Sequence, residues 1–199
     1  MLTADAPGFV VNRLLAKVMG EAARAVYEGT PVADVEKAFA PLGLPMGGPF
    51  QLIDLVGWKV AAHVQDTMVH AFPDRFYANE NFHALADLPE VVEKDKGGRV
   101  TGFTKAADKL VKQVAGSTPD LRGGDPPAGA GRPGAGDQAH AGGGVVPEVE
   151  DIDLCLILGA GWPFIDGGAS PYLDREGASE RVFGATFHTP PAIRGIAHS

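Results

Sequence analysis

A tract rich in glycine, proline and alanine divides this chain of 199 residues. Residues 117–147 read STPDLRGGDPPAGAGRPGAGDQAHAGGGVVP, with no hydrophobic periodicity and almost no large apolar side chain. Such a segment cannot bury enough apolar surface to offset the conformational entropy that is lost on ordering. Packed structure must therefore come from the sequence on either side of it. We divide the chain into a first domain (3–115), the tract (116–147), a partial second repeat (148–191) and a tail (192–199).

The sequence before the tract follows the period of an α-helix. Apolar side chains recur at helical spacing and charged side chains gather on the opposite side of the first segment. Pro7 suits the first turn of this helix and Gly29 suits its C-terminal cap. Helices are predicted over 8–28 and 31–42, as one helix from residue 49 through residue 68, and over 81–94 and 104–114. Because short turns join the first three helices, little room is left for a sheet, and we predict an all-α fold.

Composition excludes several classes of protein. The formal net charge is -8 and the sequence has no basic cluster, which argues against a nucleic-acid partner. No apolar run reaches the roughly 20 residues of a membrane span, and the N-terminus lacks the layout of a signal peptide. The single cysteine, Cys155, cannot form an intramolecular disulfide. We therefore expect a cytoplasmic protein.

Two stretches of the chain resemble each other. The first copy, DVEKAFAPLGLPMGGPFQLIDLVG (34–57), and the second copy, DIDLCLILGAGWPFIDGGASPYLDREG (151–177), share an acidic-aliphatic-acidic opening, a Gly-x-Pro segment, a glycine pair and a closing glycine. Allowing a few inserted residues, they form an imperfect internal repeat. The pattern indicates that one helical unit occurs twice.

The repeat also predicts a helix that the sequence does not show. The first copy follows the long helix 8–28, so the second copy should follow a similar helix ending near Gly144, inside the tract. One explanation is a reading-frame error: for one choice of codons, a one-base shift across 137–144 reads Thr-Arg-Leu-Met-Leu-Glu-Glu-Gly, which is helix-like. The alternative is a true flexible linker. Sequencing the DNA across the tract distinguishes the two.

The motifs of both copies resemble a known family. DAPGFVVNRLL together with GLPMGGPFQLIDLVG resembles the helical C-terminal domain of L-3-hydroxyacyl-CoA dehydrogenases. EDIDLCLILGAGWPF with GGASPYLD is similar to the second copy of that domain in the multifunctional fatty-acid oxidation enzymes. The resemblance implies tandem helical domains, the second copy degraded, without a Rossmann domain. In the family, the Rossmann domain binds NAD and carries a catalytic histidine and glutamate, while the helical domain closes over the acyl-CoA and mediates dimerisation or pseudo-dimerisation.

The resemblance also assigns roles to residues. Asn12 matches the family's active-site asparagine, which lies beside the catalytic histidine and the substrate's reacting oxygen. On a helical wheel Asn12 shares a stripe with Ala16 and Met19, so we expect it to face packed protein and to have a hydrogen-bond partner. Spacing alone would favour an asparagine that bonds a neighbouring loop or caps the helix, and only the surrounding motif favours the active-site role. Arg13 and Lys17 are candidates to bind the phosphates of coenzyme A, although such charges more commonly form a solvated helix face.

Several expected features of a dehydrogenase are missing from the sequence. No strand, Gly-rich turn and helix precede Asp5, where the family's histidine and glutamate would also lie. The glycines at 129, 131 and 134 fit Gly-x-Gly-x-x-Gly, but they lie in the tract and reflect its composition. His63 and His70 are too far apart for the i, i+4 pairing of a zinc site, and no metal site is expected. Asp54 should bond a backbone group near the Gly47-Gly48 turn, since an unpaired buried carboxylate is costly.

Two functions remain open at this point. The chain is either a fragment of an NAD-dependent 3-hydroxyacyl-CoA dehydrogenase or a non-enzymatic helical module that pairs with itself or a partner. In the first case its partners are an acyl-CoA substrate and a Rossmann domain in cis or in trans. NAD belongs to the complete enzyme, and this chain by itself should bind no cofactor and should not catalyse. Neither acyl chain length nor oligomeric state follows from the sequence.

Overall fold

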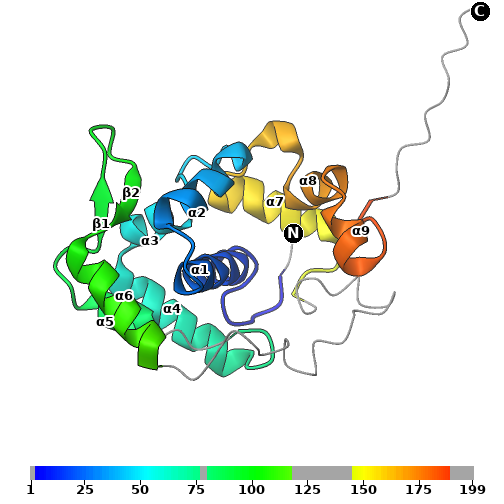
Figure 1. Cartoon of the computed structure of the whole chain (residues 1–199). Helices are drawn as coiled ribbons and strands as arrows, with labels where there is room; N and C mark the ends of the chain where they lie inside the picture. The colour runs from blue at the N-terminus through cyan, green and yellow to red at the C-terminus, as the bar shows by residue number, and fades with distance from the viewer. Residues whose placement is uncertain (1–2, 77–79, 118–144, 189–199) are drawn as a thin grey trace, which may run out of the picture.

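The computed structural model describes residues 3–76, 80–117 and 145–188 (Figure 1). The elements before the tract are α1 (Val11–Tyr27), α2 (Val32–Phe39), the 3-10 helix η1 (Ala40–Leu42), α3 (Pro49–Val56), α4 (Trp58–Ala71), α5 (Glu80–Ala86), β1 (Val92–Lys94), β2 (Val100–Phe103) and α6 (Lys105–Ser117). Those after it are α7 (Val149–Ala160), η4 (Phe164–Asp166), α8 (Ala169–Arg175) and α9 (Ala178–Phe183). The predicted helical fold is therefore confirmed, but the single helix expected over 49–68 is wrong, because the chain breaks at Gly57 (φ +94°) into α3 and α4. No helix among these elements is both long and apolar enough to cross a membrane.

The helix predicted over 81–94 is wrong in its second half. The helix ends at Ala86, and Val92–Lys94 pairs antiparallel with Val100–Phe103. Pro89 cannot continue a helix, and the β-branched pair Val91-Val92 favours a strand. Between the strands, the Asp95 carboxylate accepts hydrogen bonds from the amides of Gly97 (2.8 Å) and Arg99 (2.9 Å), which closes the turn.

The helix α1 lies between two hydrophobic cores. One core joins its small side chains, such as Ala16 and Ala23, to α3, α4, α5, the hairpin and α6. The other core joins Val10, Val11 and Leu14 to the segment 145–146 and to α7. Figure 1 shows α1 near the centre, with α4, α5 and α6 on one side of it and α7 on another. Residues before and after the tract therefore share one central helix.

The two copies of the repeat place a carboxylate in the same position. The Glu36 side chain on α2 accepts hydrogen bonds from the amides of Phe50 (2.7 Å) and Gln51 (3.3 Å) at the start of α3. The Asp153 side chain on α7 accepts one from the amide of Ser170 (2.9 Å) at the start of α8. In each copy an acidic side chain of one helix thus caps the next helix.

Glycines occupy matching positions around these caps. A Cβ atom at Gly48 would lie 2.6 Å from Glu36 Oε2, and one at Gly168 would collide with the Asp153 side chain. The two copies also touch each other reciprocally. A Cβ at Gly43 would lie 3.4 Å from the ring of Pro163, and one at Gly161 would lie 2.8 Å from the ring of Pro45. In the sequence repeat, Gly43 corresponds to Gly161 and Pro45 to Pro163.

Candidate functional site

The chain enters α1 through a tight left-handed turn. Gly8 has φ +74° and Phe9 has φ +45°. The amide of Phe9 donates to the carbonyl of Ala6 (2.9 Å), and the amide of Arg13 donates to the carbonyl of Gly8 (3.2 Å). A Cβ at Gly8 would lie 3.0 Å from Met68 Cε, so the turn packs closely against α4. Because of this turn the helix begins at Val11, three residues after the predicted start at residue 8.

Asn12 is exposed, and the expectation that it faces packed protein is wrong. It does lie one turn before Ala16, which is fully buried. However, helical side chains lean toward the N-terminus. A side chain in the first turn of α1 therefore extends past the end of the core that covers Ala16. Asn12 instead lies on the surface at the N-terminal end of α1.

Arg13 is buried at 8% exposure and lies between α1 and the end of α4. Its Nη2 donates to the carbonyl of Pro7 (3.1 Å), and its guanidinium lies 4.3 Å from the centre of the Phe72 ring. That geometry is a cation–π contact. Burial and the nearby charge of Arg75 hold the pKa of Arg13 below its ordinary value. The structure thus gives Arg13 contacts inside the chain, and its binding of coenzyme A phosphates stays a prediction.

Lys17, one turn further along α1, is half-exposed. Its Nζ donates to the carbonyl of Arg75 (2.9 Å) and pairs with Glu21 (2.8 Å). The same nitrogen lies 5.7 Å from the centre of the Phe76 ring. Lys17 and Arg13 therefore both hold α1 to the segment that follows α4. A contact of Lys17 with the coenzyme A phosphates likewise stays a prediction.

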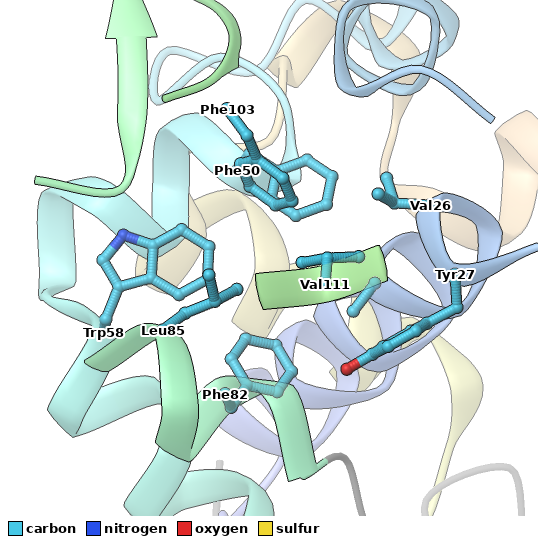
Figure 2. Close-up of a pocket in the computed structure, with 9 residues that line it drawn as sticks. Val26, Tyr27, Phe50, Trp58, Phe82, Leu85, Phe103 and Val111 are labelled. Atoms are coloured by element: carbon cyan, nitrogen blue, oxygen red, sulfur yellow. The ribbon is translucent and has the colours of Figure 1, made fainter. Parts of the chain in front are cut away.

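A small apolar cavity lies in the first core (Figure 2). It is lined by Ala23, Val26, Tyr27, Phe50, Trp58, Phe82, Leu85, Phe103 and Val111. Phe50 meets Phe103 edge to face, with ring centres 5.3 Å apart and planes at 84°. The cavity has room for no more than about one water molecule, and no set of polar groups converges on it. It is a packing gap and has no chemistry of its own.

The candidate site is therefore the N-terminal end of α1. Comparison with known proteins identifies the family of the residues around it. Residues 8–102 match the family described as 3-hydroxyacyl-CoA dehydrogenase, C-terminal domain. This part of the chain belongs to that family. The matched range begins at Gly8 and contains Asn12, Arg13 and Lys17 as well as the first copy of the repeat. The resemblance that the motifs of the first copy suggested is confirmed.

The relatives of this dehydrogenase domain are subunits of a fatty-acid oxidation complex. The "fatty acid oxidation complex subunit alpha" of Idiomarina loihiensis is 42% identical over 94 residues, which cover 47% of this chain and 13% of that protein. The subunits of the same name from Shewanella amazonensis and Vibrio campbellii are 33% and 30% identical, each across 89% of this chain and 26% of the relative. The chain thus spans between 13% and 26% of the length of these three relatives.

A second polar cluster lies outside the residues that match the dehydrogenase family. Ser170 is 5% exposed, and its hydroxyl donates a hydrogen bond to the Asp153 carboxylate. His188 Nε2 lies 2.8 Å from the serine oxygen. Because the one O–H group of the serine already donates to the carboxylate, the imidazole N–H must donate the hydrogen bond between His188 and Ser170. A nucleophilic serine needs the opposite arrangement, in which histidine accepts the proton. This cluster therefore has a structural role, which the sequence analysis missed.

Asp174 completes the attachment of the segment that contains His188. It accepts hydrogen bonds from the amides of Phe187 and His188, both at 2.9 Å, and from the Ser179 hydroxyl (2.5 Å). Burial opposes ionisation of Asp174, but these hydrogen bonds and the charge of His188 outweigh it and hold the pKa below its ordinary value. The sequence repeat could have pointed to Asp174, because this residue corresponds to Asp54 of the first copy, which the sequence analysis did consider.

The remaining candidates have ordinary surroundings. Asp54 does not bond the Gly47-Gly48 turn as expected: it pairs with Lys94 Nζ at 2.5 Å, and Glu36 is the residue that caps the turn. His63 and His70 are both exposed on α4. Within the described ranges, no group of three histidine, cysteine, aspartate or glutamate side chains is arranged to hold a metal ion.

Proposed function

We propose that this chain is the substrate-side helical domain of an NAD-dependent 3-hydroxyacyl-CoA dehydrogenase of fatty-acid β-oxidation. The observation that carries the proposal is the family match over residues 8–102, which includes the turn and the first helix. The complete enzyme would transfer a hydride between NAD and the 3-hydroxy group of an acyl-CoA. The relatives are named as subunits of a fatty acid oxidation complex, which supports a role in fatty-acid oxidation.

The described residues do not fit NAD. A dinucleotide site needs a parallel sheet and a Gly-rich turn that leads into a helix. The sheet in the described part of the chain is a two-stranded antiparallel hairpin. We therefore place NAD, with the catalytic histidine and glutamate, on a separate nucleotide domain in cis or in trans. The chain alone should be inactive.

In this proposal Asn12 acts at the junction with that nucleotide domain. Its exposure at the end of α1 leaves its amide group accessible to a substrate and to a second domain. An amide can donate a hydrogen bond to the reacting oxygen while it accepts one from a neighbouring imidazole. Arg13 supports this position through the turn, because it binds the carbonyl of Pro7. Arg13 and Lys17 are kept as secondary candidates for the coenzyme A phosphates.

Mixing experiments test the proposal. The chain is combined with the nucleotide domain of the Idiomarina loihiensis alpha subunit, and NADH formation from a 3-hydroxyacyl-CoA is followed by absorbance. We expect activity only from the mixture. Asn12→Ala should lower kcat by about 10² or more, as loss of a group that stabilises a reacting oxygen does. The matched control Leu55→Ala removes another exposed side chain and should leave the rate unchanged. No activity and no binding in the mixture would contradict the proposal.

We also propose that residues 148–191 are a partial second copy of the domain. Three features support this: the matching caps by Glu36 and Asp153, the glycines that these caps require, and the reciprocal Gly–Pro contacts. Reciprocal contacts of equivalent residues are typical of a two-fold interface. Residues 117–143 of the tract would then be a linker or the frameshifted remnant of the second long helix. An independent DNA sequence with an intact frame would exclude the remnant.

A non-enzymatic helical module is the second candidate function. It is favoured by large apolar side chains on the surface, of which Leu158 is 77%, Phe164 83% and Ile165 93% exposed. Exposed apolar surface promotes association. Size-exclusion chromatography would then show a stable homo-oligomer that stays inert with every nucleotide domain. For either function we propose a cytoplasmic location, because Cys155 has no second cysteine with which to form an intramolecular disulfide.

A further inference from the structure

Phe9 has a backbone conformation that phenylalanine rarely adopts. Its φ is +45°, and within the described residues every other positive φ belongs to a glycine. For a residue with a bulky side chain this conformation is strained. Strain of this kind persists where the surrounding structure forces it, and it is frequent at binding and catalytic sites.

The ring of Phe9 contributes little to the core of this chain. Phe9 is 54% exposed, whereas the next residue, Val10, is 4% exposed. Hydrophobic burial would offset the strain if the ring were inside the protein. About half of the residue remains in water instead. The isolated chain therefore gains little from having phenylalanine at this position.

Phe9 is one of several exposed residues around the start of α1. Pro7 and Asn12 are also exposed, while Arg13 turns inward. Phe9 precedes Asn12 by three residues, and the turn brings the chain from Phe9 directly into the helix that starts at Val11. A protein that contacts Asn12 at the end of α1 therefore meets Phe9 on the same end.

The relatives indicate what covers this surface. The matched family is named as a C-terminal domain, and the match begins at residue 8. The relatives are much longer than this chain, which covers 13% to 26% of the three compared above. A domain that precedes a C-terminal domain joins it at the start of the matched range. In this chain that position is the turn that contains Phe9.

We propose that Phe9 is the anchor on which the nucleotide domain of the dehydrogenase docks, so that this domain is held beside Asn12. The inference rests on the proposed function and adds a positioning residue to it. The left-handed turn projects the ring into solvent when the chain is alone. Docking then buries the ring and places the nucleotide domain against the end of α1.

The variant Phe9→Asn separates strain from docking. Asparagine tolerates a left-handed backbone, so the melting temperature of the isolated chain should rise by about 2–4 °C. The same change removes the ring, so the Kd for the Idiomarina loihiensis nucleotide domain should increase by about tenfold or more. Thermal denaturation and titration calorimetry measure the two effects. Phe9→Leu keeps an apolar side chain and should retain affinity within about threefold.

Leu55→Asn is the matched control, because Leu55 is 67% exposed on α3 and its loss should leave the affinity unchanged. If the unmodified chain binds and Phe9→Asn binds equally well, the anchor is excluded while the proposed function stands. An equal loss of affinity in Phe9→Leu and Phe9→Asn also overturns the proposal that Phe9 is the anchor. A fall in the melting temperature of Phe9→Asn with unchanged affinity overturns it as well. If the unmodified chain itself neither binds nor supports NADH formation, the proposed function fails and the anchor fails with it.

Discussion

The side chain of Arg13 joins the turn before α1 to the segment after α4. It does so through the hydrogen bond to Pro7 and the contact with the ring of Phe72. A hydrogen bond from a charged group contributes about 1.5–3 kcal/mol, and a desolvated cation–π contact about 2 kcal/mol. Arg13→Ala should therefore lower the free energy of unfolding by about 2–4 kcal/mol, measured by urea denaturation. Lys17→Ala removes a half-exposed cation of the same helix and should cost less than about 1 kcal/mol. Equal effects would show that burial of Arg13 does not matter.

Asp174 gives the stability of the chain a dependence on pH. Its folded pKa is below the ordinary value of 3.8, so its ionised form is favoured by folding. The stabilisation is present above the ordinary pKa and is lost as the pH falls through the folded pKa. Asp174→Asn should therefore reduce the urea midpoint at pH 6, and the gap between the variant and the unmodified chain should narrow toward pH 3. A gap that stays constant over this range would contradict the role given to the carboxylate.

Neighbouring residues in the first turn of α1 show the limits of periodicity. Hydrophobic spacing placed Asn12 on the inward stripe and Arg13 on the charged face, but Asn12 is exposed and Arg13 is buried. Periodicity describes a helix with packed neighbours along its whole length. At the start of α1 the left-handed turn and the lean of the side chains change what each position meets. Nothing in the sequence predicted the positive φ of Phe9, because phenylalanine rarely adopts it.

At the scale of elements, the caps of α3 and α8 can be tested by adding one methyl group. Gly48 has φ -82°, which alanine also adopts, so the effect of Gly48→Ala comes from its contact with Glu36. We expect it to cost about 1–3 kcal/mol of unfolding free energy. In the double variant Gly48→Ala/Glu36→Ala, the new methyl group no longer meets the Glu36 side chain. The double variant should therefore lose less unfolding free energy than the sum of the losses in the two single variants.

The second copy gives the contrasting case. Gly168 has φ +119°, a conformation that alanine does not readily adopt. Asp153→Ala should therefore fail to compensate Gly168→Ala. Urea denaturation of both sets measures the two couplings. Full additivity in the first set would contradict the contact between Gly48 and Glu36.

The long helices were the most predictable elements, and the hairpin was the least. Hydrophobic period, Gly29 and Gly43 were sufficient to locate α1 and the end of the second helical segment. The hairpin was missed because its strands are short and β1 begins soon after α5 ends, so that the two were read as one helix. The sequence repeat suggested two similar helical units, but not that Glu36 and Asp153 make the same cap. That contact depends on how two helices pack, which sequence spacing does not describe.

At the scale of the whole molecule, the candidate site lies at the end of a helix that both cores share. Sequence motifs identified its family, since a motif of this length is specific, and they led us to propose Asn12 as its functional asparagine. They did not predict that the site would be an open surface. A surface that docks against another domain contains residues whose partners lie outside the chain, so the packing rules of a single domain assign them wrongly. In the function that we propose, Asn12 is such a residue, because it lies on the inward stripe of α1 by sequence and is nevertheless exposed.

The central position of α1 predicts that the two cores unfold together. Trp58 is buried in the first core, Trp162 packs against the second, and the sequence contains no other tryptophan. The variants Trp162→Phe and Trp58→Phe therefore each leave one fluorescent reporter, in the first core and the second core respectively. In each variant, the urea midpoint measured by tryptophan fluorescence should equal the midpoint measured by circular dichroism, as two-state unfolding requires.

A core substitution extends this test. Ile152→Ala creates a gap in the second core and should cost about 2–4 kcal/mol. Because Val10, Val11 and Leu14 connect that core to α1, the fluorescence midpoint of Trp58 should fall together with that of Trp162. A shift confined to Trp162 would mean that the residues after the tract unfold independently. In that case α1 would belong to the first core alone, and the packing between the two copies would add nothing to the stability of the dehydrogenase domain.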